Sequence, residues 1–271
     1  MRTSRNLTIA GLATAFSLFG NVAMADDPCT IGNWSSAVGL DNDAVGEPSA
    51  NNRRFAGPCG LRVNVDGTAR YLVDDTPSGE TSYNVRFYFF VNGTLPNEAV
   101  IFSARTAADD ADVLRLRNTG SGMVLDGATG SGFVSTSAST LSSGWNFVEI
   151  SWDQETASVS LNGATAQTIN SGLDQTLTIG AVRLGNVSGA TGSGVSVDFD
   201  DFDSRRASGP PMLLAGDAND DGQINIFDIV ALRNEILGRS LASGMPDCNA
   251  DGSVNVFDIV CLRRQILGLN N

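Results

Sequence analysis

The sequence predicts an all-β sandwich over residues 26–206, followed by a small all-α unit over residues 217–271. Three observations predict this division. In the first unit, apolar and polar residues alternate with a period of two, which is typical of half-buried antiparallel strands. The segment 207–216 contains consecutive prolines and favours an extended linker. Beyond the linker, two similar stretches each carry an acidic loop followed by a helical pattern.

Residues 1–25 have the pattern of a Sec-type signal peptide. Arg2 and Arg5 precede an apolar stretch over residues 7–20, and Ala-Met-Ala at 23–25 forms the cleavage site. The apolar stretch is shorter than the roughly 20 residues that span a bilayer; a retained membrane anchor is the alternative. No later segment is long enough to span a membrane. We therefore expect a secreted or periplasmic protein, from an oxidising compartment in which cysteines pair.

The charged residues exclude several kinds of chemistry. All 17 basic residues are Arg, and the chain has no His. It therefore lacks the residues for a Ser-His-Asp or Cys-His nucleophile, an imidazole zinc site, a Schiff-base lysine or a Walker lysine. A net charge of -13 argues against nucleic acid and anionic lipid as partners, because an acidic surface releases no counterions from a polyanion. Hard cations are the expected partners.

The strand pattern is clearest over residues 83–91, 114–117 and 195–200. A further predicted strand over 145–152 turns back through 153–156 into a hairpin, where Asn162-Gly163 favours a tight primed turn. About 180 residues of short strands are enough to bury a core of their own. They predict a two-layer sandwich.

Two parts of this strand pattern resemble a known family. The run from Trp145 to Trp152, followed by the run from Ser158 to Gly163, is similar to the core of laminin-G-like, concanavalin A-type jelly rolls. The run from Val197 to Phe202 resembles the last strand of the bacterial members. The resemblance covers residues 29–206 and implies a jelly-roll fold in a bacterial protein. The fold hosts glycan-binding modules as well as glucanases and polysaccharide lyases, so it does not choose a function.

An internal duplication covers most of the C-terminal unit. The stretches 217–238 and 247–268 share 14 of 22 residues. Each has oxygen-bearing side chains at loop positions 1, 3, 5 and 12, a Gly at position 6 and a backbone carbonyl available at position 7, which is the ligand spacing of a calcium loop. The predicted metal ligands are Asp217, Asn219, Asp221, Gln223 and Asp228 in the first loop, and Asp247, Asn249, Asp251, Ser253 and Asp258 in the second. At position 9, Asn225 and Asn255 are expected to act through water.

Each loop is followed by a predicted helix that stops at Gly238 or Gly268, but prolines stand where an entering helix would be. This tandem loop-helix pattern resembles the type I dockerin over residues 217–271. The resemblance implies two Ca²⁺ ions and a docking surface for a cohesin-like module of another protein. Clustered carboxylates repel each other without metal, so we expect folding of this unit to depend on calcium.

In dockerins, loop positions 10 and 11 help to select the cohesin. Here these positions hold apolar residues in both copies, namely Ile226, Phe227, Val256 and Phe257. They are the candidate partner-binding residues. The alternative is that these side chains cap the small core between the two loop-helix units.

Four cysteines allow three pairings. Cys248 and Cys261 are both replaced by Ala in the first copy of the repeat, which indicates that they are neighbours in space. We therefore predict disulfides between Cys248 and Cys261 and between Cys29 and Cys59, as stabilising elements without a redox role.

A catalytic site has weak support in the sequence. Glucanases of this fold carry E-x-D-x-E or a similar motif on one strand, and the nearest match here runs from Glu149 to Glu155 with Ser151 in the middle position. The last residues of this match are also expected in a hairpin turn, so solvent-facing polar positions are the favoured interpretation. No catalytic residue is assigned, and whether the protein is an enzyme stays open.

For glycan binding the candidates are exposed aromatic residues and acidic side chains. They are Trp34, Trp145 and the group Asp198, Asp200, Asp201 and Asp203. The favoured hypothesis is a secreted, calcium-binding protein whose sandwich binds glycan and whose C-terminal unit binds a cohesin-like partner. The alternatives are a carbohydrate-active enzyme of polysaccharide degradation and a non-catalytic adhesive or scaffold protein.

Overall fold

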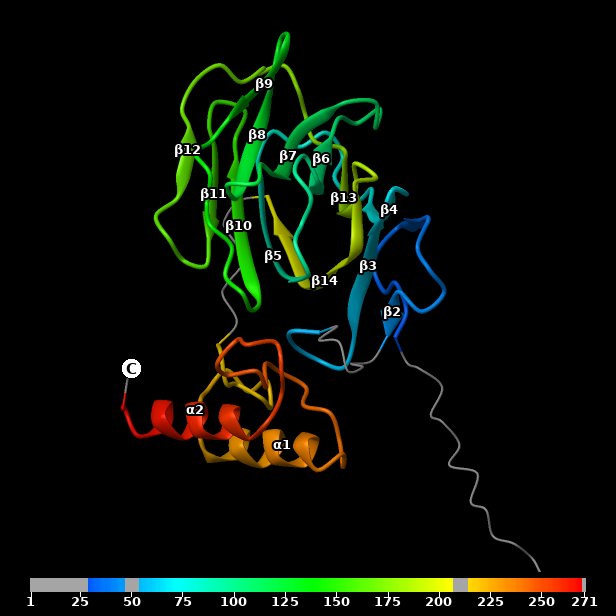
Figure 1. Ribbon diagram of the computed structural model, residues 1–271. Helices are drawn as coiled ribbons and strands as arrows, with labels where there is room; N and C mark the ends of the chain where they lie inside the picture. Colours follow the sequence, from blue (N-terminus) through cyan, green and yellow to red (C-terminus); the bar gives the residue numbers. More distant parts are fainter. Residues whose placement is uncertain (1–28, 47–53, 207–213, 270–271) are drawn as a thin grey trace, which may run out of the picture.

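The computed structural model describes residues 29–46, 54–206 and 214–269. The predicted signal peptide and residues 207–213 of the predicted linker lie outside this range. Two antiparallel sheets form the sandwich, and two helices lie below it in the C-terminal module, residues 214–269 (Figure 1). An all-β sandwich followed by a small helical module is therefore the fold, as the sequence predicts. No helix within the described ranges is long and apolar enough to cross a membrane.

Sheet 1 has seven strands in the order β1-β4-β13-β6-β7-β8-β9. Its strands are β1 (Ser36–Val38), β4 (Arg70–Asp74), β13 (Ala181–Asn186), β6 (Val100–Arg105), β7 (Asp112–Asn118), β8 (Met123–Thr129) and β9 (Gly132–Ser135). Sheet 2 also has seven, in the order β12-β11-β10-β5-β14-β3-β2. Its strands are β12 (Gln167–Ile169), β11 (Ala157–Leu161), β10 (Asn146–Trp152), β5 (Tyr83–Asn92), β14 (Thr191–Arg205), β3 (Gly60–Asp66) and β2 (Val45–Gly46).

The core lies between the two sheets and is built from the inward residues of each alternation. Phe87 of β5 stacks on Phe102 of β6, with ring centroids 5.5 Å apart, so aromatic residues join the two layers. The predicted hairpin joins β11 and β12. Asn162 and Gly163 both have positive φ, at 54° and 70°, as a primed turn requires.

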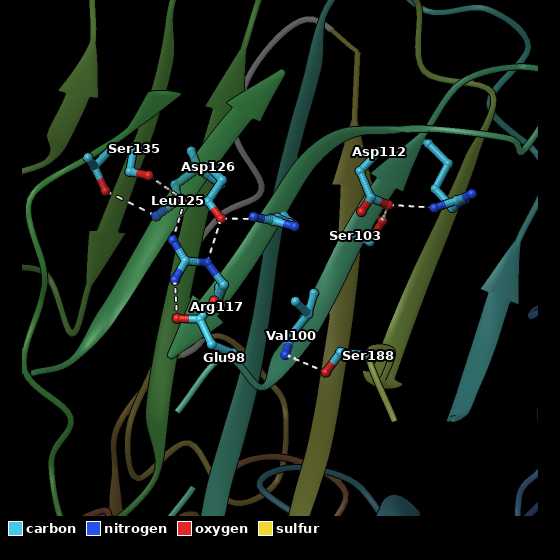
Figure 2. A network of polar contacts seen from close by, with 12 residues as sticks. Glu98, Val100, Ser103, Asp112, Arg117, Leu125, Asp126, Ser135 and Ser188 are labelled. Atoms are coloured by element: carbon cyan, nitrogen blue, oxygen red, sulfur yellow. Dashed lines mark hydrogen bonds and ion pairs between the residues drawn. The ribbon is translucent and has the colours of Figure 1, made fainter. Parts of the chain in front are cut away.

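A polar network covers part of the outer face of sheet 1 (Figure 2). Asp126 on β8 is completely buried and accepts hydrogen bonds from Arg115, Arg117 and Ser135. Burial alone would raise the pKa of Asp126, but the hydrogen bonds from Arg117, Ser135 and Arg115 lower its pKa overall. The sandwich thus pairs a buried carboxylate with cations from its own chain.

The C-terminal module has two helices, α1 (Ile226–Ile236) and α2 (Val256–Ile266). Each begins with a capping box, Asn225 with Asp228 and Asn255 with Asp258. The small core between them contains Leu232 of α1 and Leu262 of α2, both fully buried. Leucines at the same position of each copy therefore form the core of the repeat.

Two disulfides are present. Cys29 is bonded to Cys59 in the sandwich, and Cys248 is bonded to Cys261 in the second copy of the repeat. Both are the pairs predicted from the sequence. The Cys248–Cys261 bridge ties the second loop to α2, across 13 residues of chain.

The C-terminal module packs directly against the sandwich (Figure 1). A separate buried cluster joins them, formed by Phe55, Tyr88 and Trp145 of the sandwich and Met245 of the module. We call these four residues the interface cluster. They are at most 5% exposed. The module is therefore held to the sandwich by side-chain packing in addition to the chain connection.

Candidate calcium loops and exposed helix faces

Each loop is shaped by its own first residue. The Asp217 carboxylate accepts hydrogen bonds from the backbone N–H groups of Asp221 at 3.1 Å and Gly222 at 2.8 Å. Asp247 makes the same pair of bonds with Asp251 and Gly252 in the second loop, at 3.1 and 2.8 Å. These bonds fold the loop around its first carboxylate.

Gly222 and Gly252 have φ values of 78° and 87°, which explains why glycine occupies loop position 6 in both copies. Position 3 contributes to the same turn. The side-chain oxygen of Asn219 accepts from the backbone N–H of Asp221 at 3.1 Å, and Asn249 repeats this with Asp251 at 3.0 Å. Loop shape therefore comes from the same residues that are predicted to hold the metal.

The last residue of each loop closes it. The two carboxylate oxygens of Asp228 accept from the backbone N–H groups of Asn219 at 3.2 Å and Asn225 at 2.7 Å. Asp258 makes the equivalent bonds with Asn249 and Asn255, at 3.3 and 2.8 Å. Positions 1 and 12 are thus brought into one small loop, although 11 residues of sequence separate them.

The carboxylates of the loops are buried together. Asp217 and Asp247 are 6% and 2% exposed, and Asp228 and Asp258 are not exposed at all. Burial, together with the charges of Asp258 and Asp251, raises the pKa of Asp247 to about 7 against the effect of the backbone hydrogen bonds. Burial also raises the pKa of Asp258. A nearby cation would lower the pKa of both carboxylates.

The donor set fits calcium. Each loop offers three aspartates, one asparagine and the backbone carbonyl of position 7, which are the hard oxygen ligands that Ca²⁺ takes in proteins. Within the described residues, no three His, Cys, Asp or Glu side chains are arranged so that they alone could hold a metal ion. A metal ion in either loop would therefore also need the Asn and carbonyl donors. The Ser253 carbonyl currently accepts a hydrogen bond from the Asn255 side chain at 3.0 Å.

The candidate partner-binding residues are exposed. Ile226 and Phe227 are 59% and 65% exposed, and Val256 and Phe257 are 57% and 66% exposed. The alternative expectation, that these side chains cap the small core, is wrong. Asp228 and Leu232 lie four residues apart on the inner side of α1, so Ile226 and Phe227 are turned away from the core.

Sequence reasoning missed one member of each exposed face. Val230 of α1 is 48% exposed and Val260 of α2 is 51% exposed. We define the docking faces as Ile226, Phe227 and Val230 on α1 and Val256, Phe257 and Val260 on α2. A signal was available in the sequence, because both copies carry Val at this position and equivalent positions of a duplicated unit tend to share an environment.

The sandwich candidates separate into two groups. Trp34 lies beside Phe202, with ring centroids 4.7 Å apart, and both line an open groove of about 400 Å³ together with Asp203. Asn33, Asp74, Thr76 and Ser204 supply further polar groups to the groove. This groove combines an aromatic ring with hydrogen-bonding side chains, as sugar recognition requires.

The other sandwich candidates have structural partners. Trp145 belongs to the interface cluster, and Asp198 is fully buried in an ion pair with Arg62 at 2.6 Å. Asp201 forms an ion pair with Arg86. Asp200 accepts from the backbone N–H groups of residues 55 and 56 at 2.6 and 2.8 Å, and burial raises its pKa to about 7. Burial of Trp145 and Asp198 removes them from an open binding surface.

The possible glucanase motif is divided between a strand and a turn. Glu149 lies on β10, opposite Arg86 of β5 and Ser160 of β11. Asp153 lies in the following turn, where its carboxylate accepts from the backbone N–H of Thr156 at 2.8 Å. The strand therefore carries one carboxylate of the motif.

Residues 215–267 match the model of the dockerin type I domain. This match covers both loops and both helices of the C-terminal module. No curated protein matches the chain.

Among solved structures, the chain is similar to the cellulose-induced protein Cip1, with 16% identity and a TM-score of 0.47, covering 68% of this chain and 94% of that one. A family 7 alginate lyase solved with substrate gives 10% identity and a TM-score of 0.47, covering 64% and 85%. The mouse laminin α1 domains LG4-5 give 11% identity and 0.38, covering 54% and 40%. At these identities and scores the likenesses assign no function to the sandwich.

Proposed function

We propose that this protein is secreted and that its dockerin-like module binds two Ca²⁺ ions and docks noncovalently onto a cohesin-like module of another protein. One observation carries the calcium part: the four buried loop aspartates have backbone N–H groups as partners and, among the described residues, no ion pair with any Arg. An external cation supplies the missing charge. The predicted ligands are Asp217, Asn219, Asp221, Gln223 and Asp228, with Asp247, Asn249, Asp251, Ser253 and Asp258.

The docking part rests on the two docking faces. Their six side chains are between 48% and 66% exposed, on a module that keeps only a small core for itself. Exposed apolar clusters of this kind indicate a protein partner. The match of residues 215–267 to the dockerin type I domain makes a cohesin-like module the expected partner.

The first test measures calcium and partner binding on the mature chain, residues 26–271. Calorimetry should find two Ca²⁺ ions per chain, and a panel of cohesin modules should be retained in Ca²⁺ and lost in chelator. The double variant F227A/F257A should abolish retention and keep the calcium stoichiometry. The matched control is Phe133→Ala, an aromatic residue of the sandwich that is also exposed. A stoichiometry of zero, or equal retention by both variants, would contradict the proposal.

A second proposed function is polysaccharide binding by the sandwich, at the groove of Trp34, Phe202 and Asp203. The observation that favours it is the partly exposed indole beside polar groups from three segments of chain. On a glycan array, Trp34→Ala should remove binding that Phe133→Ala keeps. Release of reducing sugar from the bound glycan, abolished by Glu149→Gln, would instead establish the alternative of a carbohydrate-active enzyme.

A further inference from the structure

The sandwich has an aromatic surface that the dockerin-like module covers. Phe55 stacks on Tyr88 with ring centroids 3.8 Å apart, and its ring centroid lies 5.5 Å from that of Trp145. Met245 completes this interface cluster from the module side, and Ala215 and Ala250 pack around it. Because the module supplies these neighbours, a module that moves away leaves three aromatic rings exposed to water.

The module makes this contact with its second calcium loop. The backbone N–H of Trp145 donates to the carbonyl of Ala250, at loop position 4, at 3.1 Å. Gly144 lies so close to the same carbonyl that an added Cβ would be 2.0 Å from the oxygen. The segment just before β10 therefore meets the loop backbone directly, and the fit depends on the shape of the loop.

A second contact fixes the connection between the two repeats and the end of α1. The Arg54 guanidinium forms an ion pair with Glu235 of α1, and their side chains are only 2% and 9% exposed. Arg54 also donates to the carbonyl of Ala242 at 3.3 Å, and the backbone N–H of Gly57 donates to the carbonyl of Gly244 at 2.9 Å. These contacts hold the module in one orientation.

The first calcium loop faces carboxylates of the sandwich. Asp200 and Asp201 line a cavity of about 200 Å³ together with Asp217 and Asp220 of the loop, and none of the described residues that line it is basic. Asp201 is paired with Arg86 and Asp200 with backbone N–H groups, so the repulsion across the cavity is partial, and a cation in the loop reduces it. Contact with the second loop depends on the shape of its backbone, and contact near the first is favoured by a neutralised loop.

We propose that the aromatic surface of the sandwich is a receptor for the dockerin-like module in its calcium-loaded form, so that calcium fixes the orientation of the two modules. This inference rests on the calcium part of the proposed function and does not depend on the proposals of cohesin docking or glycan binding. Because the two modules have a fixed orientation, a partner bound to the docking faces also holds the sandwich at a fixed angle. In chelator the module leaves the surface and Trp145 becomes exposed.

The test uses the mature chain, with small-angle scattering for the radius of gyration, tryptophan emission for Trp145, and helical circular dichroism for the module. In Ca²⁺ we expect a compact particle. In chelator we expect a larger radius and a red-shifted emission that the variant Trp145→Phe lacks. An unchanged radius and emission while the helical signal is lost would overturn the inference. An unchanged helical signal in chelator would instead show that the calcium part of the proposed function fails, and the inference with it.

A matched pair of variants tests the contact itself. Gly144→Ala should give the larger radius and the red-shifted emission even in Ca²⁺, and should keep the helical signal, because the added Cβ meets the loop backbone. Gly130→Ala should behave as the original chain, since its Cβ would have no neighbour within 4 Å. Arg54→Met tests the same contact from the other side and should also enlarge the particle. A compact Gly144→Ala and a compact Arg54→Met, both in Ca²⁺, would overturn the inference.

Discussion

Asp126 of the sandwich and Asp258 of the dockerin-like module are both completely buried, but their surroundings differ. Asp126 is held by Arg117 (Figure 2) and by Arg115, and its pKa is lowered. Asp258 is held by backbone N–H groups beside other carboxylates, and its pKa is raised. Asp126 therefore has counterions from its own chain, and Asp258 does not. Because Asp258 also belongs to a loop with the ligand spacing of a calcium site, its surroundings favour a cation from solution.

The same comparison holds beyond this pair. Asp198 of the sandwich is fully buried with Arg62 as its ion-pair partner. The four arginines of the module are Arg233, Arg239, Arg263 and Arg264, and none of them forms an ion pair with a loop aspartate among the described residues. They lie in or beyond the last turns of the helices, where positive charge is favourable for the helix dipole.

The largest expected effect comes from removing loop aspartates of the C-terminal module. The double variant D228A/D258A removes the carboxylate that closes each loop, so the module should lose its helical circular dichroism even in millimolar Ca²⁺. Loss of a residue that merely orients a metal ligand already costs roughly 10–100-fold in affinity, and a ligand should cost at least as much. Asp220→Asn is the matched control, because it removes a charge from the same loop at a non-ligand position. Retained helix in the double variant would contradict the assignment.

The next largest effect comes from removing the buried carboxylate of the sandwich. Asp126→Ala leaves Arg115 and Arg117 without their shared partner. Since these arginines are 26% and 15% exposed, water compensates in part, and we expect a loss of about 3 kcal/mol in the free energy of unfolding. Denaturant titration should show this loss equally in Ca²⁺ and in chelator. A loss that depends on calcium would contradict the view that Asp126 relies on arginines of its own chain and only the loop aspartates rely on a metal ion.

A smaller effect concerns the difference between the two copies of the repeat. The variant C248A/C261A gives the second copy the two alanines that the first copy has at 218 and 231. Loop-closure entropy for a bridge across 13 residues predicts a loss of roughly 3 kcal/mol or less, mostly recovered when Ca²⁺ ties the same loop. Thermal unfolding in Ca²⁺ and in chelator measures this. An equal loss under both conditions would show that the bridge and the metal act independently.

The smallest effect is a dependence on pH of opposite sign in the two modules. Asp247 has its pKa raised to about 7 in the folded, metal-free loop, against about 4 in an unfolded chain. The folded form then binds the proton more tightly, so the metal-free module should gain stability as pH falls from about 7 to 4. Helical circular dichroism in chelator should be greater at pH 5 than at pH 8.

The sandwich should show the reverse. The pKa of Asp126 is lowered in the folded state, so its contribution to stability is present at neutral pH and is lost as pH falls through that lowered pKa. Asp126→Asn should reduce this loss in acid. A module that is destabilised between pH 7 and 5 in chelator would contradict the role given to Asp247.

The predictable parts of this protein are those with local causes. The strands at 83–91 and 145–152 were predicted from alternation, and β5 and β10 occupy those positions. The tight turn at Asn162-Gly163 follows from the residues themselves. Short strands such as β1 and β2 were not predicted, because three or two residues carry no periodic pattern and are fixed by the strands beside them.

By itself, the sequence determined the two modules, the two repeated loops that we propose to bind calcium, and the pairing of Cys248 with Cys261, because each depends on spacing within a short stretch or on comparison of the two copies. Tertiary structure decided which apolar residues face water and which are covered. Phe227 and Phe55 are both aromatic residues in irregular or terminal positions, yet Phe227 is 65% exposed and Phe55 is 3% exposed. The reason is that burial depends on what another part of the chain places opposite a residue, which local sequence does not contain.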